Sequence, residues 1–184
     1  EDDYFQSSLF TIARRRILWL LILVLANGLT TKVIAMNDQI LKEIVLLAAF
    51  IPLLIGTGGN VGAQSSTVVI RGLSTQKLKS LGAIKAVVKE AITGALLGVF
   101  MMLVVFPFAW WQGEGPLIAS AVGISLISIT TLAATTGAIL PLLFDRMKLD
   151  PALMSSPFIT TVTDIAGVFI YLSTAKWLLN SSLG

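Results

Sequence analysis

The sequence predicts an all-α integral membrane protein, a single domain over residues 1–184 with five transmembrane helices. Hydrophobic residues make up 55 % of the chain and charged residues 12 %, and the mean hydropathy is +0.89, as in multi-pass membrane proteins. Five apolar stretches are long enough to cross a bilayer. Basic residues gather beside alternate ends of these stretches, which predicts a cytoplasmic amino terminus and a carboxyl terminus outside the cell.

The first two predicted spans cover residues 17–36 and 44–70 and are joined by a short polar turn at 37–43. Three arginines at 14–16 directly precede the first span and predict that the chain enters the membrane from the cytoplasm. A basic loop follows the second span and is predicted to be cytoplasmic as well; its basic residues are Arg71, Lys77, Lys79, Lys85 and Lys89.

The third predicted span, 88–111, ends in an aromatic cluster that is typical of a membrane interface. The fourth, 117–144, is rich in Ser and Thr, which we interpret as helix packing and bending through hydroxyl bonds to the backbone. Arg146 and Lys148 then predict a cytoplasmic turn before the fifth span, 151–179.

A single carboxylate, Asp164, lies at the midpoint of the fifth span, roughly 20 Å from either end of a helix of that length. A charged side chain at the bilayer centre costs about 2.5 to 3.5 kcal/mol, so it normally faces a cavity, a partner charge or an ion. Helical spacing places Thr160, Ser156, Gly167 and Tyr171 on the same face. Asp164 therefore belongs to a polar stripe.

No Lys or Arg is predicted at the depth of Asp164, so a structural ion pair is not expected. Carboxylate and hydroxyl oxygens are ligands for hard cations such as Mg²⁺, Ca²⁺ and Mn²⁺. The stripe therefore predicts a cation site.

The second span contains PLLIGTGGNVGAQSSTVVIRG, from Pro52 to Gly72. Its proline and its glycines, Gly59 among them, weaken a helix, while Asn60 and Gln64 place two amides on one helical face. One interpretation is a pore wall or ion site made of amide oxygens and carbonyls freed from the helix. The alternative is close helix packing through small residues, with the amides bonding between helices.

Cysteine and histidine are both missing from the sequence, which excludes disulfides, thiolate metal sites and an imidazole base. The glycine cluster at 56–62 follows no strand and precedes no lysine, unlike a phosphate-binding loop. We expect no enzymatic activity, because the sequence holds no convincing nucleophile or catalytic dyad. We expect no nucleic-acid partner, because the basic residues are explained by topology and by contacts with membrane lipids.

Two long motifs resemble the MgtE family of magnesium channels and transporters: IPLLIGTGGNVGAQSSTVVIRGL and ILPLLFDRMKLDPALMSSPFITTVTDIAGVFIY. The resemblance implies a multi-pass homodimer in the cell membrane, with a Mg²⁺ pathway between the subunits lined by the second and fifth helices. It implies that Asp164 recognises Mg²⁺ beside Thr160 and that Asn60 lines the pore. Some members have Asn in place of Ser156. The remaining residues expected to line the pore are Gly59, Gln64, Pro157 and Gly167.

Typical members of that family also carry an acidic amino-terminal helical domain, a pair of CBS domains and a plug helix. None of these is recognisable in the sequence, and a start at Glu1 favours a chain shortened from a longer protein. Two other functional classes stay open. In a secondary transporter coupled to protons or another cation, Asp164 would be the carrier of the coupling ion. In a scaffold without transport, the polar stripe would only join helices.

Overall fold

The computed structural model describes residues 8–75 and 82–182, and within these ranges it contains helices and no strand. The helices occur in the order α1 (Leu9–Ala35), α2 (Asp38–Glu43), α3 (Val45–Ser74), α5 (Ala83–Ala109), a π-helical turn η1 (Trp110–Glu114), α6 (Gly115–Arg146) and α7 (Pro151–Ser182). The all-α class is therefore confirmed.

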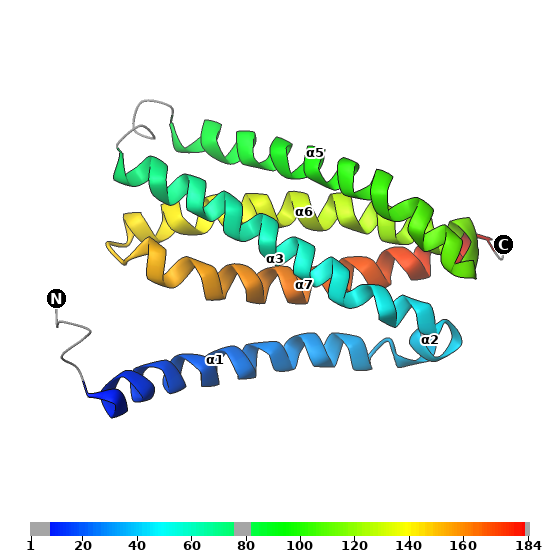
Figure 1. The fold of residues 1–184 in the computed structure, drawn as a ribbon, viewed down its shortest axis with the longest axis horizontal. Coiled ribbons are helices and arrows are strands. Elements are labelled where there is room, and N and C mark those ends of the chain that lie inside the picture. The colour runs from blue at the N-terminus through cyan, green and yellow to red at the C-terminus, as the bar shows by residue number, and fades with distance from the viewer. Residues whose placement is uncertain (1–7, 76–81, 183–184) are drawn as a thin grey trace.

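Helix α6 forms the centre of the bundle and packs against α3, α5 and α7. Its buried face includes Val122, Leu126 and Ile129, each with no exposed surface. In Figure 1, α5 lies along one edge of the molecule and α1 along the opposite edge, where α1 packs on α7. The two edge helices therefore leave long apolar faces uncovered.

Small residues bring the long helices into backbone contact. A Cβ atom added to Gly94 of α5 would lie 2.5 Å from the backbone oxygen of Thr130 in α6. One added to Gly62 of α3 would lie 2.5 Å from the Ile159 side chain of α7. One added to Gly137 of α6 would overlap the backbone oxygen of Gly62. Such close approach is the usual way in which helices pack inside a membrane.

Four segments are long and apolar enough to cross a membrane in the described part of the chain: Val45–Ser74, Ala83–Gln112, Gly115–Arg146 and Ser155–Asn180. The first helix, α1, has a shorter apolar stretch, Leu20–Ala35. Four of the five predicted spans are thus matched by such helices. The count of five and the orientation of the termini stay predictions.

The helices extend beyond the predicted spans because a helix need not end where the apolar residues end. Helix α1 begins at Leu9, so the arginines at 14–16 lie inside it rather than before it. Helix α5 begins at Ala83, directly after Gly82, whose φ of 84° is easily reached only by glycine. The predicted turn at 37–43 contains α2. Lys77 and Lys79 lie outside the described residues.

The structure bears on the two interpretations of the glycine-rich second span. Helix α3 is continuous from Val45 to Ser74 with Pro52 inside it, so the segment stays helical despite its proline and glycines. Gly58 and Gly62 are buried against Ile129 and Ile159, so they allow close packing of α3 on its neighbours. Packing contacts compensate for the weak helix propensity of these glycines.

Candidate functional site

The carboxylate and hydroxyls of the predicted stripe lie on an accessible face of α7. Ser156 and Thr160 are exposed and Asp164 is partly buried. Asp164 follows the first residue of α7 by 13 positions, roughly 20 Å along the helix axis. The face therefore brings three oxygen-bearing side chains to three successive turns in the middle of an apolar helix.

The hydroxyl of Thr160 is oriented by its own helix. It donates to the backbone oxygen of Pro157 at 3.0 Å and lies 3.3 Å from that of Ser156. Because its proton points back to the helix, the lone pairs of its oxygen face away and can accept hydrogen bonds from outside. Thr160 can thus act as an acceptor beside Asp164.

Helix α3 crosses α7 in the opposite direction and approaches it at the Thr160 turn (Figure 1). A Cβ atom on Gly59 would lie 4.0 Å from the Thr160 side chain, and one on Gly58 would lie 3.7 Å from that of Thr163. Asn60 follows Gly59 and is exposed. Gly59 thus lies against the Thr160 turn at ordinary contact distance, and Asn60 follows it in α3.

Asp164 forms no ion pair or hydrogen bond with any residue of the described ranges. Nor do three Asp, Glu, His or Cys side chains gather at any place in these ranges. One chain thus presents a single carboxylate with two hydroxyls on the same face of α7, and an exposed Asn60 on the neighbouring helix α3. This set can hold a hydrated cation through its water molecules, whereas it is too small to replace the six ligands of Mg²⁺.

Four other residues of the predicted stripe or pore lining lie apart from this face or at its edge. Gly167 is buried, and a Cβ atom there would lie 3.6 Å from Ile129 of α6. Tyr171, also predicted for the stripe, is fully buried in the core. Pro157 is partly buried in α7. Gln64 is exposed but also lines a cavity between α3 and α5. The accessible stripe thus ends near Asp164.

A second carboxylate, which was not among the predicted site residues, lies inside the bundle. Ser65 of α3 is buried, and its hydroxyl donates a short hydrogen bond to the partly buried carboxylate of Glu90 in α5. The two residues line a cavity of about 160 Å³ together with Gln64 and Thr93. An acid within the predicted third span was the signal that could have identified it.

Comparisons with known proteins give a consistent result. Residues 51–174 match the model of the MgtE family, which is described as a divalent cation transporter. The chain is 39 % identical over 166 residues to a magnesium transporter MgtE of Thermus thermophilus, covering 90 % of this chain and 37 % of the relative. It is 32 % identical over 182 residues to one of Bacillus subtilis, covering 98 % of this chain and 40 % of the relative. The chain thus spans less than half of these relatives.

Proposed function

The chain belongs to the MgtE family of divalent cation transporters, and from this premise we propose that it moves Mg²⁺ across the cell membrane through a pore between two copies. The observation that carries the proposal is the unpaired Asp164 carboxylate on an accessible polar face, in the middle of an apolar helix. Such a group is unstable against lipid. Water, an ion or a second protein surface must therefore cover it.

A second copy of the chain would satisfy this requirement by symmetry. In a two-fold dimer, residues close to the axis meet the same residues of the partner. Placing the α3–α7 crossing at the axis would bring two Asp164 side chains to opposite sides of one water-filled path. The polar faces would then be covered, and the apolar faces of α5 would remain in contact with lipid.

Mg²⁺ gives up its hydration water reluctantly and usually keeps several waters when bound. Two Asp164 carboxylates would therefore hold a largely hydrated ion by accepting hydrogen bonds from its waters. Thr160 and Asn60 offer further oxygen acceptors along the same face, and Ser156 would extend this lining by one turn. Selectivity would come from the fit of the hydrated ion between the two subunits.

The membrane potential can drive this movement without a coupling ion. A divalent cation gains roughly 4.6 kcal/mol on entering a cell with an inside-negative potential of 100 mV, because each charge contributes about 2.3 kcal/mol. A channel is therefore the simplest mechanism.

The test is Mg²⁺ entry into liposomes that contain the purified protein and an internal dye, under an inside-negative potential. Asp164→Asn keeps the size of the side chain and removes its charge, so we expect at least a tenfold loss of flux. Thr163→Val changes a buried residue on another side of α7 and should leave the flux unchanged.

Other outcomes separate the competing functions. Flux that needs a pH gradient and persists without divalent ions would support a coupled transporter with Asp164 as the carrier. Absence of flux in every preparation would support a scaffold. Equal Mg²⁺ flux in the wild type and Asp164→Asn would contradict the proposed ion site.

A further inference from the structure

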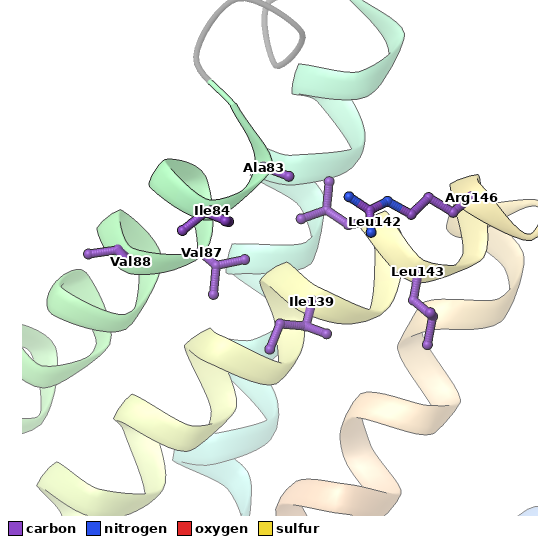
Figure 2. Close-up of a pocket in the computed structure, with 8 residues that line it drawn as sticks. All are labelled: Ala83, Ile84, Val87, Val88, Ile139, Leu142, Leu143 and Arg146. Atoms are coloured by element: carbon purple, nitrogen blue, oxygen red, sulfur yellow. The ribbon is translucent and has the colours of Figure 1, made fainter.

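An apolar groove of about 330 Å³ runs between the start of α5 and the end of α6. Seven of its eight lining residues are apolar, and the eighth is Arg146. Figure 2 shows the Arg146 side chain extending from the end of α6 toward Leu142 and the start of α5. The groove thus combines an apolar floor with a cation at one end.

A second groove of about 370 Å³ lies on the other side of the first turns of α5. It shares Ile84 and Val88 with the first groove, and Lys85 and Lys89 line it. Ile84 is 80 % exposed, so it forms a ridge between the two grooves. The start of α5 therefore carries two neighbouring grooves, the second of them lined by α5 residues, together with Lys85 and Lys89. Arg146 of α6 adds a third basic side chain at the first groove.

These basic residues are available to a ligand. Lys85, Lys89 and Arg146 form no ion pair with an acid in the segments that the structure describes. They lie at the end of the bundle where α3 and α6 end and α5 begins, the end predicted to be cytoplasmic (Figure 1). Cytoplasmic leaflets are rich in anionic lipids. The positive charge of these residues and their place at this end of the bundle thus both suit a lipid phosphate, with its acyl chains in the apolar grooves.

A second copy of the chain fits this surface poorly, because a symmetric contact would bring the same basic residues against each other. We propose that the paired grooves bind one anionic phospholipid, with an acyl chain on each side of Ile84 and the phosphate near Arg146 and Lys85. The proposal concerns a surface remote from Asp164 and does not depend on ion transport.

Native mass spectrometry of the detergent-purified protein tests this site, with equal amounts of phosphatidylglycerol and phosphatidylcholine of identical chains. We expect the anionic lipid to be retained preferentially, and the preference to fall about fivefold for each basic contact removed. The paired substitution Arg146→Gln with Lys85→Gln should nearly abolish it. If that pair does not fold, Arg146→Gln alone should lower it about fivefold.

Two matched variants separate this site from general surface attraction. Arg71→Gln removes an exposed charge that is outside both grooves and should leave the preference unchanged. Val87→Phe fills the first groove without changing charge and should weaken retention of both lipids. Equal retention of the two lipids by the wild type, or an unchanged preference after Arg146→Gln, would overturn the proposal, as would unchanged retention in Val87→Phe.

Discussion

At the residue scale, comparing the two threonines near Asp164 distinguishes a hydroxyl that can contact an ion from one that only bonds within its helix. Thr160 is exposed and Thr163 is buried, yet both donate hydrogen bonds to backbone oxygens of their own helix. Replacing either by Val keeps the shape of the side chain and removes only the hydroxyl. The two substitutions should therefore differ mainly in what the hydroxyl offers outside the helix.

We expect Thr160→Val to weaken Mg²⁺ binding about fivefold, which corresponds to the loss of one hydrogen bond of about 1 kcal/mol. Thr163→Val should leave the affinity unchanged. Isothermal titration of the purified protein with Mg²⁺ measures both. If Thr163→Val binds Mg²⁺ more weakly than Thr160→Val does, the ion does not lie at the Thr160 face of α7, and the proposed site is wrong.

Glycines at helix crossings give a second prediction. A Cβ atom on Gly137 would overlap the backbone of α3, which cannot move aside as a side chain can. We expect Gly137→Ala to destabilise the bundle by about 1 to 3 kcal/mol, the usual range for overpacking. Gly28→Ala is the matched control, because nothing lies within 4 Å of the added atom. Thermal denaturation in detergent measures both, and similar midpoints for the two variants would contradict the prediction.

The sequence marks Asp164, Thr160 and Asn60 as candidates because a polar residue in an apolar run is visible without knowing the fold. It could not separate Asp164 and Thr160 from Gly167 and Tyr171, which share their face of the helix by spacing alone. Burial depends on which helix covers each turn of α7, and Gly167 packs beside Ile129 of α6. Such information is absent from the periodicity of one helix.

At the scale of elements, the hydrogen bond between Ser65 and Glu90 joins α3 to α5. Removing Ser65 leaves a partly buried carboxylate without this partner, which costs about 1 to 3 kcal/mol. We expect a double-mutant cycle of Ser65→Ala and Glu90→Ala to give a coupling energy of at least about 0.5 kcal/mol.

The control for this cycle is Ser128→Ala, since the Ser128 hydroxyl donates only to Ile124 within α6. Paired with Glu90→Ala, it should show additive effects. Chemical denaturation in mixed micelles supplies the free energies of unfolding. Additivity of Ser65→Ala and Glu90→Ala would mean that the bond contributes nothing to the packing of α5 on α3.

Helix α3 shows how far local sequence rules apply. Its apolar length predicted a span, and Val45–Ser74 is long and apolar enough to cross a membrane. Pro52 and the glycines left open whether this segment would form a pore wall or pack closely, and the helix through them is continuous. Glycine weakens a helix in isolation by roughly 0.5 to 1 kcal/mol. In the bundle, Gly58 and Gly62 allow contacts with Ile129 and Ile159 that a larger residue would prevent. The packing that stabilises the helix involves partners far away in the sequence.

At the scale of the whole molecule, the arrangement of accessible faces predicts which surface joins two copies. The α3–α7 face has exposed polar groups in the middle of the bundle, whereas the outer face of α5 is apolar after Thr93. Lipid can cover the second face but not the first. A dimer should therefore form through α3 and α7 and leave α5 on the outside.

The chain has no cysteine, so a single introduced thiol reports on this dimer without background. Residues near a two-fold axis lie close to their own counterparts, which predicts that Thr160→Cys can be linked between two copies by oxidation or by a short bifunctional maleimide. Ile84→Cys is also exposed but lies on α5, and its counterpart in the second copy should be out of reach. Gel electrophoresis of membranes after linking measures the covalent dimer. Efficient linking through Ile84→Cys with none through Thr160→Cys would place the interface on α5. Each Asp164 would then lie on the outer side of its own subunit. Two Asp164 side chains could therefore share no ion.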